Sequence, residues 1–581
     1  MKTKVELAPD YYRENFITLL TEVISLYEDL LHDPEIQFAK NFQALSLPPQ
    51  CLFVRLISRK GPLFRSDKLE YQEIPSIGDA ANELYSAGFI SRDGDFPLQD
   101  LLALLRKPEL ISLTEELELL IQRNEKKAAL IDQIGELGEE SEIADFIKTK
   151  FHVYAPLRLE ALSLYMLLFF GNFYQDLSEF VIADLGIVNY EQYPLDRSIR
   201  PFSRRELIDT VIELHSVSEE LSEGLSELSA DQLMTLIATV PDPIDHPVIL
   251  RRHGRLCTTV ARQLERLNDP ESAIRVYEMT DFQPSRERQA RIHYKIGNAK
   301  KATEIVETIN RMSGNEEELD FASAFADKIE GKRRPSADKT DVSDTQVICI
   351  AEPIGPSVEE FVLNMYAQAG VAGFYTENTL WCGLFGIAFW DIIFSPIVGA
   401  FFNPYQRGPA DLYEPDFRSR REQLIQAKLC HILDVSEIRW RRELRRTYRE
   451  KCGTANAFVN WKYFTEELFS VAIKSIPPAH FVAVFDRICS NIRTNTAGFP
   501  DLVLFPRIKA KRISGGAQRY DVITEEDRHL PYLLVEVKGP GDQLQKNQKR
   551  WMRHFRGVGV PHRVVRLKKV DSSMTSIQTL R

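Results

Sequence analysis

The sequence lacks the cysteine patterns of disulfide-linked and zinc-binding proteins. Its 581 residues include 7 cysteines, but none forms a CxxC pair or stands at a spacing from histidine that suits zinc. The start of the chain also lacks a secretory signal, because the charged segment from Met1 to Glu6 leads into Pro9 and Asp10 without an apolar stretch. We therefore expect a cytoplasmic protein without a zinc finger.

A long uninterrupted apolar run is also missing. The stretch 381–402 is apolar enough to imitate a membrane span, but Asp391 and Pro396 lie inside it. A charged residue and a helix breaker are both unfavourable in the centre of a bilayer. We predict that this stretch forms a buried core helix and that the protein has no membrane partner.

The chain has no overall excess of positive charge, since its formal net charge is −11. However, residues 401–581 contain 33 of the 73 Lys and Arg residues and only 19 of the 84 Asp and Glu residues. A basic C-terminal region attracts a polyanion such as DNA, whereas the acidic remainder keeps the chain soluble. A solvated helix surface explains the same charges equally well, so this pattern alone leaves both interpretations open.

The length and composition indicate a globular protein with several domains. With 44% hydrophobic and 27% charged residues, the chain can bury sizeable cores, and its length suits about three or four domains. Helical periodicity dominates the first 325 residues, and a polar, breaker-rich segment then precedes a strand-like run at 346–350. We predict three regions: a helical DNA-binding region at 1–150 with a winged-helix-like part, a helical tetratricopeptide-like domain at 151–340, and a domain with strands at 341–581.

Two short apolar strands in the last region carry charged residues. Asp501 opens the first strand, and Glu536 and Lys538 lie in the second. Residues two apart on a strand point to the same face, so Glu536 and Lys538 share one side. Hard carboxylates hold the divalent ions that phosphodiester cleavage needs. This PD…ExK pattern predicts a nuclease centre in which Asp501 and Glu536 bind metal, the Val537 carbonyl adds a ligand, and Lys538 orients or polarises the attacking water.

The motif alone is weak, because ExK also occurs at residues 125–127 and 330–332. Those copies lie in polar helical or linker sequence, whereas Glu536 lies among apolar strand formers, where an isolated charge is costly to bury. This context favours a functional acid. A structural ion pair between Glu536 and Lys538 at a sheet edge is the alternative.

A helix is expected after these strands, with Asp542 as its cap. Leu544, Gln548, Trp551 and Phe555 fall on one stripe at helical spacing, and Gln548 is the polar exception. Its amide either points into the centre to hold water or a phosphate, or is a satisfied amide in the core. We predict the first role, which makes Gln548 a catalytic residue.

Other basic residues near the C-terminus offer contacts to DNA phosphates. Arg418, Arg420 and Arg421 form one cluster, for which we predict DNA contacts. A second run, from Arg439 to Arg446, resembles a solvated helix face as much as a DNA track. The insert 506–531 between the two acidic strands is rich in Lys and Arg, and it is either a basic hairpin near the cut site or a solvated loop.

Taken together, these motifs resemble a known family. The sequences GFPDLV and LVEVKGP around the acidic strands look like the VRR-NUC nuclease domain of the PD-(D/E)xK superfamily, and TEN with GLFGIAFWDIIF upstream is similar to the bacterial Fanconi-associated nucleases. The segments with this likeness are 52–57, 68–71, 376–378, 383–394, 416–421, 498–503, 534–540 and 542–551. The resemblance therefore extends over nearly the whole chain.

The resemblance implies both a fold and an activity. The fold is multidomain, with mostly α-helical N-terminal and middle parts, a SAP-like part among them, and a C-terminal α/β nuclease domain of the restriction-endonuclease type. The activity is that of a 5′ flap endonuclease and 5′ to 3′ exonuclease on branched DNA in interstrand crosslink repair. We expect the protein to be associated with the nucleoid while it is bound to DNA. Animal members carry a ubiquitin-binding zinc finger; nothing before Tyr11 can form one, so we expect none.

The resemblance also adds site residues that spacing does not reveal. Glu377 matches the family's additional metal-binding glutamate. Glu377, Asp501, Glu536 and the Val537 carbonyl are then expected to hold Mg²⁺ or Mn²⁺, as two ions. This would make the centre a three-carboxylate, two-metal site.

Further DNA contacts follow from the position of basic residues in the matching regions. Arg55 and Lys68 lie in the N-terminal segments with the family likeness. Arg286, Arg288 and Arg291 lie roughly where the family has its pocket for a 5′ phosphate. We expect all five to contact DNA.

Two other functions are compatible with the core motif. A Holliday-junction resolvase built as a dimer would share it, but would not need the long helical N-terminal portion. A non-catalytic DNA-binding scaffold with an inactive nuclease fold is the third hypothesis, and the intact Asp501, Glu536 and Lys538 argue against it.

Overall fold

The computed structural model describes residues 8–122, 124–175, 188–313, 315–332, 345–350, 355, 357–510 and 522–569. The chain forms two compact units, Met1–Arg205 with Phe401–Gln406 and Glu206–Ala400 with Arg407–Arg581. The middle of the basic insert and the boundary expected near residue 340 lie outside the described residues. The expected domain limits at 150 and 340 therefore stay predictions.

The first unit has an aromatic core between its first helices. The rings of Phe16, Phe42, Phe53 and Phe89 contact one another, with centroids 4.9 to 6.4 Å apart. Gly88 sets the position of Phe89, since its φ of 71° is a left-handed conformation that glycine adopts without strain. The helices concerned are α1 (Tyr11–Tyr27), α2 (Asp33–Ala44), α3 (Leu47–Ile57) and α4 (Ile77–Ser86).

A small sheet and a leucine-rich helix cluster complete this unit. Strands β1 (Phe64–Arg65), β3 (Val153–Pro156) and β2 (Ile90–Arg92) pair antiparallel in that order. The second core is lined by leucines and isoleucines such as Leu102, Leu113 and Ile134. The remaining helices of the unit are α5 (Leu98–Leu104), α6 (Lys107–Glu116), α7 (Lys127–Leu137), α8 (Glu140–Lys150) and α9 (Leu159–Phe170).

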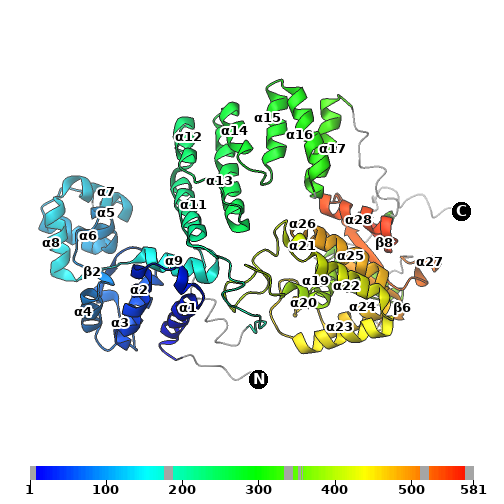
Figure 1. The fold of residues 1–581 in the computed structure, drawn as a ribbon, viewed down its shortest axis with the longest axis horizontal. Helices are drawn as coiled ribbons and strands as arrows, with labels where there is room; N and C mark the ends of the chain where they lie inside the picture. The colour runs from blue at the N-terminus through cyan, green and yellow to red at the C-terminus, as the bar shows by residue number, and fades with distance from the viewer. Residues whose placement is uncertain are drawn as a thin grey trace, which may run out of the picture. The chain divides into compact units, whose positions relative to one another are not determined.

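The second unit begins with an array of helices that stand side by side (Figure 1). Small buried residues, Ala290, Ala302 and Ala322, allow neighbouring helices of the array to approach closely. The array is stacked in the manner of helix pairs and ends at the edge of the sheet domain. Its members are α11 (Arg205–Gly224), α12 (Ala230–Ala238), α13 (Pro247–Arg266), α14 (Pro270–Glu278), α15 (Ser285–Lys295), α16 (Ala299–Met312) and α17 (Glu316–Ile329).

A five-stranded mixed sheet follows, with the order β4-β8-β7-β6-β5. Strands β4, β8 and β7 run parallel, whereas β6 is antiparallel to both β7 and β5. Every residue of the central strand β7 is buried, and Val535 and Val537 belong to the apolar core on one side. The strands are β4 (Thr345–Ile350), β5 (Val371–Tyr375), β6 (Leu502–Lys509), β7 (Leu533–Lys538) and β8 (His562–Lys569); α18 (Val358–Gln368), α27 (Glu525–Arg528) and α28 (Lys546–Val558) lie between them in sequence.

A group of helices is inserted between β5 and β6. The apolar stretch 381–402 is buried over most of its first part, as predicted. However, it begins with two short helices that end at Ile393, so the expected single core helix is wrong. No single helix in the described part of the chain is long and apolar enough to cross a membrane; the pair α24 (Glu466–Ser475) and α25 (Pro478–Ser490), bent by 113°, passes by length and composition only. The inserted helices are α19 (Thr379–Ala388), α20 (Trp390–Ile393), α21 (Phe417–Arg420), α22 (Glu422–Asp434), α23 (Glu437–Lys451), α24 (Glu466–Ser475), α25 (Pro478–Ser490) and α26 (Ile492–Asn495). The expected division into helical N-terminal and middle parts and a C-terminal α/β domain is confirmed.

Candidate active site

The pairing of two strands brings the two motif carboxylates together. Leu502 of β6 lies opposite Val535 of β7, and the same antiparallel register continued by one residue places Asp501 beside Glu536. The Val537 amide donates a hydrogen bond of 2.8 Å to Oδ2 of Asp501. Asp501 is therefore fixed at the start of β6 with its carboxylate directed at the neighbouring strand.

Glu536 lies inside the domain with a partly satisfied carboxylate. Its side chain has no exposed surface, and its Oε1 accepts from Lys538 Nζ at 2.7 Å and from Gln548 Nε2 at 2.6 Å. Its Oε2 is buried and has no hydrogen-bond partner. The ion pair between Glu536 and Lys538, which the alternative interpretation of the motif predicts, is present. It leaves the second carboxylate oxygen without a hydrogen-bond donor. A buried carboxylate oxygen without a donor is costly, so the site is arranged for a cation.

The same environment changes the acidity of the two carboxyls. Burial, followed by the neighbouring Asp501 carboxylate, raises the pKa of Glu536 to about 8, although Lys538 opposes the rise. Burial also raises the pKa of Asp501 to about 6, against the Val537 hydrogen bond and the Lys538 charge, and with help from Glu359 and Glu377. Acids that repel one another in a buried site are typical of a centre completed by metal.

Glu377 is anchored beside Asp501 by its backbone. The amides of Thr376 and Glu377 donate to the Asp501 carbonyl at 2.8 and 3.0 Å, and Glu377 has a φ of 34°, a strained conformation for a residue with a side chain. Its carboxylate is exposed and accepts from the Tyr375 hydroxyl at 2.9 Å. Within the described residues, no three or more His, Cys, Asp or Glu side chains already stand in a metal-binding group.

Two neighbours of the centre escaped the sequence reasoning. Glu359, in the first turn of α18, acts electrostatically on Asp501; in the sequence it is indistinguishable from an acid that favours a helix N-terminus. Asn378 accepts from the amides of Gly498 and Phe499 at 3.1 and 3.3 Å. Its place next to Glu377 was a signal, but its partner is 120 residues away.

Gln548 lies where the sequence placed it, but its helix starts differently from expectation. Helix α28 begins at Lys546 and Gln545 is its N-cap, so the prediction that Asp542 caps it is wrong. Asp542 instead accepts from the Gly539 amide at 3.0 Å, which closes the turn after β7. Because Gln548 is the third residue of the helix, its Oε1 accepts from the Gln545 amide while its Nε2 donates to Glu536.

The residues expected to bind DNA all take part in ion pairs within the protein. Arg421 is fully buried against Asp411, where a phosphate cannot reach its guanidinium in this structure. The other side chains are partly exposed. The pairs are Arg55 with Glu73, Lys68 with Asp67, Arg286 with Asp281, Arg288 with Glu265, Arg291 with Glu287, Arg418 with Asp486, and Arg420 and Arg421 with Asp411.

Comparisons with known families agree with this geometry. Residues 436–569 match the model of the VRR-NUC domain, and residues 10–91 match the model described as FAN1, HTH domain. The matched segment 436–569 contains the carboxylate strands and α28. The fold and the site therefore define a DNA nuclease with a VRR-NUC domain.

Proteins that are similar over nearly the full length of this chain indicate to which family of DNA nucleases it is related. The Fanconi-associated nuclease 1 homolog of Pseudomonas aeruginosa is 33% identical over 95% of both chains. The homolog from rice is 25% identical over 96% of this chain and 63% of its own length. The crystal structure of paFAN1 bound to 2nt 5′ flap DNA with gap superposes with a TM-score of 0.83 at 32% identity, covering 98% of this chain and all of that one.

The chain belongs to the Fanconi-associated nuclease family. Membership implies that its nuclease activity depends on a divalent metal. The donor set agrees, because the unmatched Oε2 of Glu536 and the Asp501 carboxylate are hard oxygen ligands in a buried position.

Proposed function

We propose that this protein is a structure-selective DNA nuclease that cuts 5′ flaps and degrades DNA from 5′ ends during repair of interstrand crosslinks. The observation that carries the proposal is the buried pair Asp501 and Glu536, with one unmatched carboxylate oxygen, in a chain whose fold resembles paFAN1 over nearly its whole length. That relative was crystallised with 5′ flap DNA in two forms, carrying flaps of 1 and 2 nucleotides.

Four groups of this chain would hold the metal. Asp501 and Glu536 would supply carboxylate oxygens, and the carbonyl of Val537, which follows Glu536 on β7, would add a further ligand. Glu377 completes the set once its side chain leaves Tyr375 and turns toward Asp501, whose carbonyl already holds the Glu377 backbone. We expect the set to hold two Mg²⁺ or Mn²⁺ ions, because hard cations prefer several oxygen ligands. Such ions lower the barrier to attack by water and neutralise charge on the phosphate.

The remaining side chains of the centre orient the Glu536 carboxylate and the reacting groups. Lys538 and Gln548 both donate to Oε1 of Glu536, which fixes this carboxylate and leaves Oε2 without a donor. The Lys538 ammonium is a positive charge on the face where the phosphate must lie, so it orients the attacking water and the phosphate. Both ends of the Gln548 amide are bonded within the protein, so its role in the centre is to position Glu536.

A substrate panel tests the proposal. With Mn²⁺ and end-labelled DNA we expect incisions near the branch of a 5′ flap, at a rate at least ~10-fold above that on a four-way junction of the same sequence, because the long helical portion is expected to recognise the branch. The rates are measured as single-turnover cleavage on denaturing gels.

Other outcomes would assign another function. Symmetrical cleavage of the four-way junction by a dimer would support a resolvase. Tight binding to every branched DNA without cleavage in Mg²⁺ or Mn²⁺ would support a non-catalytic scaffold. Equal cutting of flap, blunt duplex and single strand would contradict structure selectivity.

A further inference from the structure

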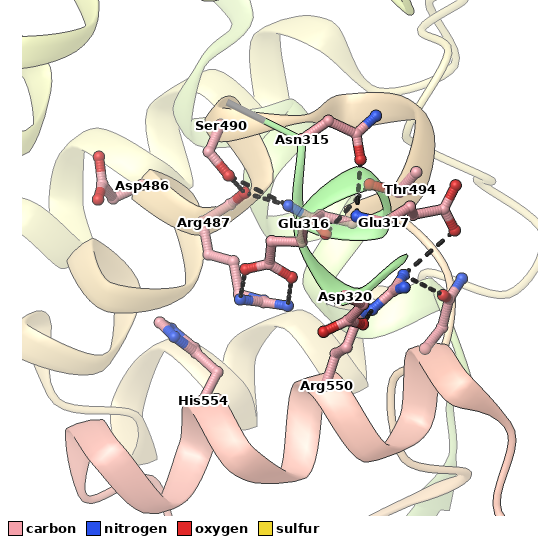
Figure 2. Close-up of polar contacts among 12 residues, drawn as sticks. Asn315, Glu316, Glu317, Asp320, Asp486, Arg487, Ser490, Thr494, Arg550 and His554 are labelled. Carbon is pink, nitrogen blue, oxygen red and sulfur yellow. Dashed lines mark hydrogen bonds and ion pairs between the residues drawn. The ribbon is translucent and has the colours of Figure 1, made fainter. Parts of the chain in front are cut away.

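The last helix of the array, α17, is joined to the nuclease domain by charged contacts near its N-terminus (Figure 2). Glu316 forms a two-pronged ion pair with Arg487 of α25, at 2.5 and 2.6 Å. Asp320 and Glu317 bind Arg550 of α28 at 2.8 and 3.1 Å. We call Glu316, Glu317 and Asp320 the α17 clamp.

We propose that the α17 clamp is a positioning element of the nuclease centre, which acts by holding Arg487 and Arg550 and through them α28 and the loop before Asp501. This inference rests on the proposed function, because it concerns the same centre. It makes the activity of the C-terminal domain depend on a helix that belongs to the helical array.

The first path to the centre runs through Arg487. Its guanidinium lies 4.9 Å over the Trp551 ring of α28, a distance at which a cation is attracted to the ring face. Trp551 packs against Phe499, with centroids 4.2 Å apart. Phe499 precedes Asp501 by two residues, so the position of Arg487 is transmitted to the metal ligand by packed rings.

The second path runs through Arg550. Its Nη1 also binds Oδ1 of Asn547 at 3.2 Å. Asn547 packs directly on Gly498, where an added Cβ would lie 2.7 Å from the Asn547 Cβ. The residue between Asn547 and Lys549 is Gln548, which donates to Glu536. Arg550 therefore sits two residues from the amide that fixes the buried carboxylate.

Because Arg487 and Arg550 are buried, their positions depend on the acids of the α17 clamp. The side chains of Arg487 and Arg550 are 10% and 9% exposed, whereas the three acids are 39% to 53% exposed. A buried guanidinium that loses its carboxylates tends to move toward water. Such a movement would displace Trp551 and Asn547, and a displacement of about 1 Å at a reacting centre can lower a rate about 100-fold.

The test changes only the acids, which lie outside the nuclease centre. In the full chain, Glu316→Gln, Glu317→Gln and Asp320→Asn together keep the side-chain shapes and remove the three charges. We expect kcat on the substrate that the wild type cuts to fall at least ~10-fold, the Mn²⁺ concentration for half-maximal rate to rise, and KM for the DNA to change less than twofold. A purely structural role would lower the thermal midpoint without moving kcat or the Mn²⁺ midpoint below that temperature.

The matched control lies at the other end of the same helix. Glu330, the C-cap of α17, forms an exposed ion pair with Lys332. Glu330→Gln therefore removes an acid at this end of the helix without touching the nuclease domain, and it should leave kcat unchanged. A cycle of Glu316→Gln, Arg487→Gln and the double variant tests the pair: we expect the double variant to lose no more than the worse single one. Additive losses, or a triple variant with wild-type kcat and Mn²⁺ midpoint, would overturn the inference. A wild type that cuts no flap would instead refute the proposed function.

A separate observation concerns the outer face of α23. Arg442, Arg445, Arg446 and Arg449 recur at helical spacing on one stripe, opposite the buried Trp440, Leu444 and Tyr448. Across the described residues, these four arginines have no ion pair or hydrogen bond, in contrast to Arg439 and Arg441 of the same helix. Together with Ile438 and Glu450 they line an open hollow of about 530 Å³.

The geometry points to this arginine stripe as a binding surface for the phosphate backbone of DNA. The stripe extends over about 10 Å of helix, from the rise of ~1.5 Å per residue, and a DNA strand presents one phosphate per ~3.4 Å of axis. Four consecutive phosphates of one strand span about 10 Å, and they thus match the four guanidinium groups in length and charge. Each guanidinium has donors to spare, because none is bound to a carboxylate of the described chain.

The salt dependence of binding tests this surface without cleavage. In Ca²⁺, changing the four arginines to Gln should weaken 5′ flap DNA binding ~10-fold or more at 0.15 M salt and reduce the slope of log affinity against log salt by about 2 to 4. The double variant of the ion-paired Arg439 and Arg441, to Gln, is the matched control and should change either quantity much less. Unchanged affinity and slope in the quadruple variant would exclude the stripe, whereas equal losses in both variants would show only a general charge effect.

Discussion

Asp501→Ala is expected to abolish DNA cleavage, with a rate at least ~10³-fold below the wild type. Asp501 holds its place through the Val537 amide and interacts electrostatically with the Glu536 carboxylate, so its removal takes away one of the two buried carboxylate ligands. The fold should survive, because the deleted carboxylate is itself raised in pKa by burial and so is not a source of stability.

Single-turnover cleavage of a 5′ flap in Mn²⁺ measures this effect. Binding of the same DNA in Ca²⁺ should persist, which separates loss of chemistry from loss of substrate. Glu525→Gln removes an exposed carboxylate of the same domain and should cut at the wild-type rate. If Asp501→Ala cuts like the wild type, the centre has been assigned to the wrong residues.

A second large effect concerns pH and metal together. Without metal, the native protein holds protons on Glu536 up to about pH 8 and on Asp501 up to about pH 6, whereas both are lost near pH 4 to 4.5 when the chain unfolds. At these two carboxyls the folded state thus binds more protons between these limits, and their contribution to its stability falls as pH rises from about 4.5 to 8. The fall is about 1.4 kcal/mol for each pH unit over which the native state holds one extra proton.

Divalent metal should reverse this trend. A cation favours the ionised carboxylates, so Mn²⁺ is expected to stabilise the domain strongly at pH 8 and little at pH 5, where protons compete for the same oxygens. Because a chain with several domains does not unfold in one step, the local readout is hydrogen exchange of the β7 amides.

The variant Glu536→Gln provides the control for this linkage. It removes the group with the higher pKa, so most of the pH dependence between 6 and 8 and most of the Mn²⁺ effect should disappear. Exchange of β4 and of the helices α11 to α14, which lie before the α17 clamp in the array, should not respond to Mn²⁺ in either protein. A wild type whose β7 exchange is insensitive to Mn²⁺ at pH 8 would show that the carboxylates do not bind metal.

The catalytic strands were accessible to sequence reasoning because their signals are local. An acid and a lysine two apart within an apolar run share a face wherever that run forms a strand, and Glu536 and Lys538 do so. The apolar stretch that begins at Trp381 was likewise assigned to the core from its composition, and the structure buries it. Glu377 needed the family resemblance, because one acid before a helix has no local meaning.

The cap of α28 shows where local reasoning fails. Asp542 is a good capping residue, but the turn after β7 uses it to bind the Gly539 amide, and the helix starts four residues later. The DNA-contact arginines show the same limit. Arginine usually lies on the protein surface, yet Arg421 is buried inside the domain, where it pairs with Asp411.

By itself, the sequence determined the helical and α/β parts, the metal-binding pattern of Asp501, Glu536 and Lys538, and the resemblance to a nuclease family. Only the tertiary structure decided which charges are matched within the protein and which are not. It joined Arg550 to Asp320 across 230 residues and left one oxygen of Glu536 without a donor. It also left Arg442, Arg445, Arg446 and Arg449 of α23 without a carboxylate among the residues that the structure describes. Periodicity and motif spacing are local properties of the chain, whereas ion pairing and burial depend on which distant segments the fold brings into contact.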